Sequence, residues 1–294
     1  MSLPIPEPPA TSASLPLPRA PRRPTSLIRP PTGWTGIGLD ELWRFRGLVA
    51  TFAGRDLKLR YRQTALGVLW FVLQPLIMAA TFAFVFGAVA GMPAERVPRL
   101  VFTYAGVLAW NLFSYIVTRG SQSMVLNAPL ISKVYFPREL LPLSLVLPAL
   151  VDFAVALVVL VVLAAMNSVA PQAAVLLLPV WIALVCLLAC GIALVTSALT
   201  VWYRDLQFLV QLAMQLLLYV SPLAYSVESV PPRFRPFVAL NPLAPLLEGF
   251  RWSLIGDGHL SGRQVLYAVV VSLGSFFIGL VVFRRLERRF ADVV

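Results

Sequence analysis

The residues of this sequence that could take part in chemistry are few, and they lie in apolar surroundings. Asp152 stands inside a long apolar run, where a carboxylate is costly and often functional, for example in proton transfer. No basic residue accompanies it in that run, so a structural hydrogen bond is the stronger interpretation. Cys186 and Cys190 lie four residues apart, and the only histidine of the chain is His259. These are too few ligands for a zinc site, so we expect no metal site.

Three glutamines form a second group of polar residues in apolar surroundings. Gln207, Gln211 and Gln215 recur every four residues, so they share one face of a helix. Amides that face lipid are costly, and this face should therefore meet protein or water. Hydrogen bonding between helices and the wall of a polar conduit explain the pattern equally well.

Cations crowd against the start of the first long apolar run, and the run itself contains polar residues. Positive charge at this position would attract an anionic group at a membrane surface. Gln74 and Pro75 lie inside the run, where a proline bends a helix and leaves a carbonyl for neighbouring helices to satisfy. The cations that precede the run are Arg55, Lys58, Arg60 and Arg62.

The composition places these residues in a membrane protein. Of 294 residues, 59% are hydrophobic and 13% are charged, whereas a soluble protein has about 25% charged residues. The mean hydropathy is +0.82. The net charge of +11 would suit a nucleic-acid-binding protein, but the cations flank apolar runs and form no solvated basic face. We therefore expect no nucleic-acid partner.

Six apolar runs are long enough to cross a bilayer, which takes about 20 helical residues. The expected fold is therefore an all-α polytopic membrane protein. With the N-terminus inside, 18 of the 24 Lys and Arg residues lie on the inner side, so both termini should be cytoplasmic. The expected spans are 65–90, 100–118, 140–166, 172–201, 206–225 and 264–283.

Outside the spans, the sequence predicts two tails and an interface helix. Residues 1–36 are rich in proline and lack the hydrophobic core of a signal peptide, so they should form a disordered cytoplasmic tail. Residues 37–63 carry an apolar stripe that includes Val49 and Phe52, with basic residues opposite. That pattern is typical of an amphipathic helix lying in the membrane interface. Residues 285–294 should be a cytoplasmic C-terminal tail.

The segment before the last span should contain short helices on the outer face. Residues 226–262 are too polar to cross a membrane and too apolar for a simple loop, and the expected gate helices lie at about 228–258. Asn241, Pro242 and Gly256 are typical of the start and the end of one helix, and the residues before Asn241 are a candidate for a second. At about 15 residues the first helix cannot span the bilayer. We expect a re-entrant or surface helix that acts either as an outer gate or as an interfacial anchor.

Several segments resemble one family of transporters, in the order expected for it. The stretch RDLKLRYRQTALGVLWFVLQPL, residues 55–76, is similar to a signature of the ABC-2-type exporter permeases for polysaccharides and polyol phosphates. These are the Wzm-like O-antigen and TarG-like teichoic-acid subunits. The resemblance extends from residue 40 onward, whereas the proline-rich tail departs from the family's usual short N-terminus. Later segments that fit are NAPLISKVYFPRELLPLS (127–144), LVDF (150–153), WYRDLQFL (202–209), SPLAYS (221–226) and NPLAPLLEGFR (241–251).

The resemblance implies a half-transporter in the bacterial inner membrane. Two copies would form a channel through their transmembrane domains, residues 64–284, and two separate ATPase subunits would bind ATP and Mg²⁺ beneath them. A coupling segment at about 119–139 would dock on the ATPase, and the cations would hold the pyrophosphate-lipid head of a lipid-linked polysaccharide. The residues implied are Asn127, Leu130, Lys133, Tyr135 and Phe136 for coupling; Arg55, Lys58, Arg60 and Arg62 for the cargo entrance; Trp70, Phe71, Gln74, Gln207, Gln211, Gln215 and Tyr219 for the channel lining; and Asn241, Phe250, Arg251 and Trp252 for the outer gate.

Two groups of alternatives stay open at this point. The same scaffold would also suit teichoic acid, capsule, lipid or drug cargo. An ion-coupled flippase or a membrane glycosyltransferase belongs to a different class, but the sequence shows neither inverted repeats nor the carboxylate cluster that sugar-nucleotide and metal binding need. The sequence also has no G-x-x-x-x-G-K-[ST] segment to hold the phosphates of a nucleotide. We therefore expect a permease with no catalytic site and no bound cofactor of its own.

Overall fold

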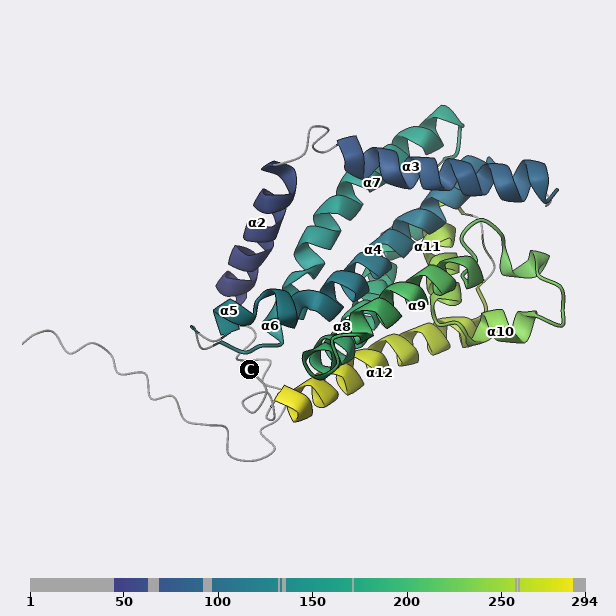
Figure 1. Cartoon of the computed structure of the whole chain (residues 1–294). Coiled ribbons are helices and arrows are strands. Elements are labelled where there is room, and N and C mark those ends of the chain that lie inside the picture. The colour runs from purple at the N-terminus through teal and green to yellow at the C-terminus, as the bar shows by residue number, and fades with distance from the viewer. Residues whose placement is uncertain are drawn as a thin grey trace, which may run out of the picture. The chain divides into compact units, whose positions relative to one another are not determined.

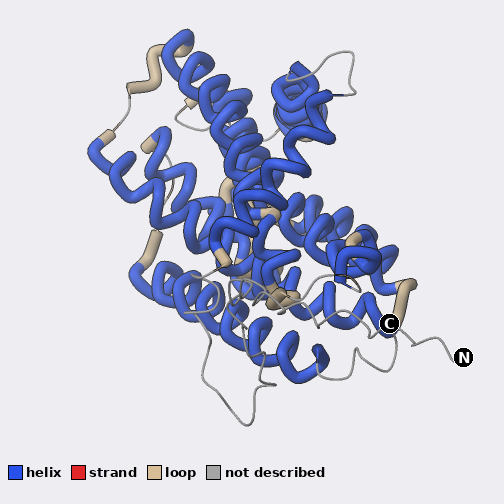
Figure 2. Tube along the Cα trace, turned by 90° about the vertical axis from the view of Figure 1, so that its left-hand side faces the viewer, coloured by secondary structure: helices blue, strands red, loops and turns tan. Residues whose placement is uncertain are grey.

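The structure is a computed structural model that describes residues 45–62, 69–91, 97–131, 133, 136–170, 172–256, 258 and 260–287 (Figure 1). These residues form helices and connecting turns, with no strand among them (Figure 2). The chain divides into two units, Met1–Gly38 and Leu39–Val294, and all described residues belong to the second. The expected N-terminal tail, 1–36, and residues 288–294 of the expected C-terminal tail lie outside the described residues.

Five segments of the described chain are long and apolar enough to cross a membrane, which confirms the helical membrane class. They match the first, second, third, fourth and sixth expected spans. The segments are Leu69–Val89 (α3, Leu69–Phe84, and the π-helix η1, Val85–Val89), Arg99–Leu126 (α4), Leu140–Met166 (α6, Leu140–Ser144, and α7, Val146–Met166), Ala173–Trp202 (the 3-10 helix η2, Ala173–Leu177, and α8, Leu178–Trp202) and Gly262–Glu287 (α12).

The fifth expected span forms a shorter helix. α9, Leu206–Val220, has 15 residues, which give about 22 Å of helix against a hydrocarbon layer of roughly 30 Å. A tight turn precedes it, in which the Leu206 amide donates to the Tyr203 carbonyl at 3.0 Å. The expected number of six crossings therefore stays a prediction.

α4 is the central helix of the described unit. It packs against α3, α7, α8, α9 and α11, and most of its length is buried. Its sequence explains this position, because apolar residues occur on every side of the helix and not along a single stripe. The buried Tyr104 hydroxyl finds a partner across the interface by donating to the Ala156 carbonyl of α7 at 3.2 Å.

α8 and α12 pack closely because both carry glycine at their contact. A Cβ atom on Gly191 would overlap the backbone of Ser275, and one on Gly279 would overlap the backbone of Gly191. The missing side chains let the two backbones approach each other, as small residues do in other membrane helix pairs. By contrast, a Cβ atom on Gly274 of α12 would meet no atom within 4 Å.

α2, Arg46–Arg62, packs against α6 and α7. Its Phe52 side chain is buried and meets Phe136 edge to face, with ring centroids 5.5 Å apart. The helix lies within the expected interface helix, 37–63, of which residues 37–44 and 63 lie outside the described residues. Because part of the expected lipid-facing stripe contacts protein, the position of α2 in the membrane interface stays a prediction.

The segment between α9 and α12 contains short helices, as the sequence predicts: η3, Val227–Ser229; α10, Arg235–Leu240; and α11, Leu243–Ile255. The Asn241 side-chain oxygen accepts a hydrogen bond from the Leu243 amide at 3.0 Å, so Asn241 caps α11, which starts one residue later than expected. Gly256 ends α11 in the left-handed conformation, with a φ of 68°. Nearly all of α11 is buried and packs against α4 and α8, which favours a re-entrant helix over a surface helix.

Candidate functional site

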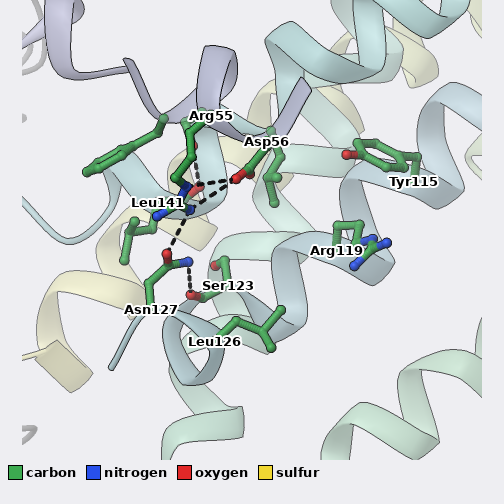
Figure 3. A pocket seen from close by; sticks show the side chains of 11 residues that line it. Arg55, Asp56, Tyr115, Arg119, Ser123, Leu126, Asn127 and Leu141 are labelled. Atoms are coloured by element: carbon green, nitrogen blue, oxygen red, sulfur yellow. Dashed lines mark hydrogen bonds and ion pairs between the residues drawn. The ribbon is translucent and has the colours of Figure 1, made fainter. Parts of the chain in front are cut away.

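Among the residues that the structure describes, two cavities adjoin the central helix α4. The first, which we term the α2 cavity, has a volume of about 500 Å³ and lies between α2, α4 and α6 (Figure 3). The second, the α3 cavity, has a volume of about 300 Å³ and lies between α3, α4 and α7. Tyr115 and Arg119 of α4 line both cavities. The two cavities are therefore neighbours along α4.

The α2 cavity brings together residues from the entrance and coupling predictions. Arg55 of α2 forms an ion pair with Asp56 at 3.0 Å, and its Nη2 atom also donates to the Asn127 side-chain oxygen at 2.9 Å (Figure 3). The Asn127 side-chain amide in turn donates to the Ser123 carbonyl at 2.8 Å. A residue of the expected entrance and a residue of the expected coupling segment, 72 positions apart, are thus in direct contact.

Arg119 is a cavity residue that sequence reasoning missed. The expected second span ends at residue 118, whereas α4 continues to Leu126, so the expected coupling segment, 119–139, begins inside this helix and its role stays a prediction. Arg119 lies seven residues before the end of the helix, which is about 10 Å along its axis. Gly120 does not end the helix and instead permits close contact with Ala193 of α8. Figure 3 shows the Arg119 side chain apart from the Arg55–Asp56 pair.

The α3 cavity gathers polar residues inside apolar segments. Phe71 and Gln74, two of the predicted channel-lining residues, line it from α3, and Asp152 lines it from α7. Pro75 also lines it, and α3 continues through this proline. Amides, hydroxyls and aromatic rings in one cavity suit a ligand that is rich in hydroxyl groups. Further polar residues from α4 are Asn111, Ser114 and Thr118.

The other predicted channel-lining residues line neither cavity. Trp70 is exposed at the start of α3. On α9, Gln211, Gln215 and Tyr219 are exposed, and Gln207 is half-buried. The Tyr219 ring meets Phe82 of α3 edge to face, with centroids 6.4 Å apart. The described residues thus leave much of the glutamine face uncovered, and its role stays a prediction.

The loop after α4 carries the predicted coupling residues. It contains α5, Ala128–Ile131, in which Leu130 is half-buried, and the following Lys133 is exposed. Phe136 is only 4% exposed, so its ring contacts the chain's own core, and its contact with a partner stays a prediction. Tyr135 lies outside the described residues. Of the entrance cations, Lys58 is exposed on α2, and the side chains of Arg60 and Arg62 lie outside the described residues.

Two ion pairs join the end of this loop to the last helix. The Arg284 guanidinium of α12 donates to Glu139 Oε1 through two nitrogens, at 2.8 and 3.2 Å, and Glu139 is only 4% exposed. Arg138 Nε lies 3.7 Å from Glu287 Oε1. We term these four residues the clasp. A charge-assisted bond to a buried carboxylate holds the loop and the end of α12 in one relative position.

The predicted outer-gate residues pack against the core. The Asn241 side-chain amide donates to the Ser221 hydroxyl at 3.0 Å. Arg251 is 1% exposed, and its guanidinium carbon lies 4.1 Å from the centroid of the Phe102 ring of α4. These contacts attach α11 to the central helix, and the gate role stays a prediction. The other two residues, Phe250 and Trp252, are buried and half-buried.

Known relatives resemble this chain over most of its length. The sequence model of the family described as ABC-2 type transporter matches residues 48–255. The O-antigen export system permease protein RfbA of Klebsiella pneumoniae is 29% identical over 254 residues, which cover 84% of this chain and 95% of the relative. A protein of the same name from Myxococcus xanthus is 27% identical over 257 residues, which are 86% of this chain and 98% of the relative. The polysialic acid transport protein KpsM of Escherichia coli is 23% identical over 235 residues, 79% of this chain and 91% of the relative.

The family match begins within α2 and ends at the last residue of α11. It therefore takes in every residue that lines the two cavities, the loop after α4 and α11. The apolar helices and the family match agree on a protein that crosses the membrane several times. This chain belongs to the ABC-2 type transporter family.

Proposed function

We propose that this chain is the permease subunit of an ATP-driven exporter, which moves a lipid-linked polysaccharide of the O-antigen type from the cytoplasm across the bacterial inner membrane. The observation that carries the proposal is the extent of the similarity to two proteins named O-antigen export system permease. The aligned parts cover 84% and 86% of this chain and 95% and 98% of those relatives. Nearly the whole length of each relative therefore has a counterpart in this chain.

The energy for export would come from partner subunits. Two copies of the chain, each crossing the membrane six times with both termini in the cytoplasm, would form the channel. Two ATPase subunits, which carry the ATP and Mg²⁺, would bind on the cytoplasmic side at the loop that contains α5. Two contacts support a role of this loop in transmitting movement: Asn127 accepts a hydrogen bond from Arg55 of α2, and the clasp joins Glu139 to α12.

A capsule-type polysaccharide is the second candidate cargo. The observation that favours it is the similarity to KpsM, which is named for polysialic acid transport and matches 79% of this chain. Such a transporter would use the same permease and ATPase arrangement and would differ in the glycan that it exports. Deletion of the gene separates the two candidates, because O-antigen export predicts loss of the surface O-antigen and capsule export predicts loss of the capsule.

Reconstitution with the partner tests the proposed function. The chain would be purified with the ATPase subunit that accompanies it and placed in liposomes that contain lipid-linked O-antigen glycan. We expect glycan to cross the bilayer only with the ATPase and ATP present, and a hydrolysis-deficient ATPase serves as the control. Translocation by the chain alone, or the absence of any accompanying ATPase in cells, would contradict the proposal.

A further inference from the structure

Arg119 is a cation in the apolar helix α4, where a charged side chain is stabilised by an anion or by water. It belongs to α4, one of the five segments that are long and apolar enough to cross a membrane, and lies about 10 Å before the end of that helix. An arginine in a membrane segment is costly unless it reaches an anion or water. Among the residues that the structure describes, Arg119 forms neither a hydrogen bond nor an ion pair, and its side chain is exposed at the two cavities.

The other charged groups of the two cavities leave Arg119 as the place for an anion. In the α2 cavity, Arg55 is paired with Asp56 at 3.0 Å, so their charges largely cancel. In the α3 cavity, the Asp152 carboxylate would repel an anion. The positive charge that is open to a ligand therefore lies at Arg119, where the two cavities meet.

The groups beside Arg119 in the α3 cavity suit a sugar. Gln74 and Asn111 present amides, and Thr118 presents a hydroxyl, all of which hydrogen-bond with the hydroxyl groups of a carbohydrate. Phe71 and Tyr115 add aromatic rings, which pack against the apolar faces of sugar rings. The volume of about 300 Å³ is at the small end of ligand pockets, so it suits the first sugar of a glycan and not a long polymer.

We propose that Arg119 binds the phosphate of a lipid-linked sugar and that the α3 cavity binds the sugar attached to that phosphate. The inference rests on the proposed function and adds the residues that would recognise the cargo. A guanidinium group binds phosphate through paired donors, which makes arginine better suited than lysine to this contact. The lipid chain would stay in the bilayer beside α3 and α7, two helices with many exposed apolar side chains.

Phosphate in a membrane has two sources, the sugar-bearing carrier and bulk anionic phospholipid, and a binding experiment distinguishes them. The full chain would be placed in nanodiscs of phosphatidylcholine and titrated with three probes. The probes are a prenyl diphosphate that carries one N-acetylglucosamine, the same prenyl diphosphate without the sugar, and phosphatidylglycerol. We expect the sugar-bearing probe to bind most tightly and phosphatidylglycerol to displace it poorly.

Matched variants assign the two halves of the site. Arg119→Gln should weaken both prenyl diphosphates about tenfold or more, because it removes a charge-assisted hydrogen bond, and Arg119→Lys should bind with intermediate affinity. Asn111→Ala should weaken the sugar-bearing probe severalfold and leave the sugar-free probe unchanged. Arg204→Gln is the control for a lost positive charge, because Arg204 is exposed in the turn before α9 and lines neither cavity.

Three outcomes would overturn the inference. If Arg119→Gln bound the sugar-bearing probe with wild-type affinity, Arg119 would not be part of the binding site. Equal affinity for phosphatidylglycerol would mean that the site holds bulk phospholipid. Equal affinity for the two prenyl diphosphates would remove the sugar from the α3 cavity. Because the measurement needs neither ATP nor the ATPase, a chain that lacks an ATPase partner but binds the probe as expected would refute the proposed function and leave the site intact.

Discussion

At the scale of single residues, the contacts that organise the site join positions far apart in the sequence. Arg55 and Asn127 are 72 positions apart, and Glu139 and Arg284 are 145 apart. Local patterns place Arg55 within α2 and the other three residues at or next to the end of a helix, but they carry no signal for the partner. Arg119 was misplaced for a related reason, since an isolated arginine resembles the start of a loop until the packing of α4 is known.

The clasp gives a stability prediction at this scale. Arg284→Gln should lower the free energy of unfolding by about 1–3 kcal/mol, because the buried Glu139 carboxylate loses its charged donor. The measurement is thermal unfolding of the purified chain in detergent. Arg263→Gln, on the same helix and exposed, is the control and should unfold like the wild type. Equal unfolding of the two variants would show that the Arg284–Glu139 pair contributes nothing to stability.

At the scale of elements, the sequence predicts helices well where the local chemistry is strong. The capping residues of α11, Asn241 and Gly256, are correctly predicted because their side-chain and backbone preferences act within a single turn. The length of α9 is not predicted, because apolar residues resume after Ser221 and Pro222 although the helix has ended at Val220. The burial of α11 also depends on packing against α4 and α8, which composition does not encode.

The glycine contact between α8 and α12 yields a prediction for this pair. Gly279→Leu should reduce the amount of folded protein severalfold, because the new side chain would overlap the α8 backbone at Gly191. Gly274→Leu, five residues earlier on the same helix, should fold normally, because its Cβ atom meets open space. Size-exclusion chromatography of both variants in mild detergent measures the difference. Normal yield of Gly279→Leu would show that the two backbones can separate.

At the scale of the whole molecule, composition and the distribution of charge predict the membrane class, and the five long apolar helices confirm it. The side of the membrane on which each loop lies is inferred from the distribution of Lys and Arg residues in the sequence, and it stays a prediction. Coupling to an ATPase and the glycan that is exported depend on partners, so the packing of one chain carries no direct signal for them.

Thiol labelling tests the predicted topology. The two native cysteines, Cys186 and Cys190, are buried, so they should add little background. In intact cells, Leu240→Cys, at an exposed position of α10, should react with a membrane-impermeant maleimide supplied from outside. Leu247→Cys, at a fully buried position of α11, is the control and should not react. Labelling of Leu240→Cys only from the cytoplasmic side would reverse the predicted orientation.

The close contact of α8 and α12 also bears on how such a protein works. Two backbones that touch without intervening side chains have little room to slide, so α8 and α12 should move together as a rigid pair. Opening a passage must then displace helices that are held more loosely. α3 and α9 fit that description, because both leave long apolar faces uncovered. We therefore expect transport to involve movement of α3 and α9 relative to the rigid pair of α8 and α12.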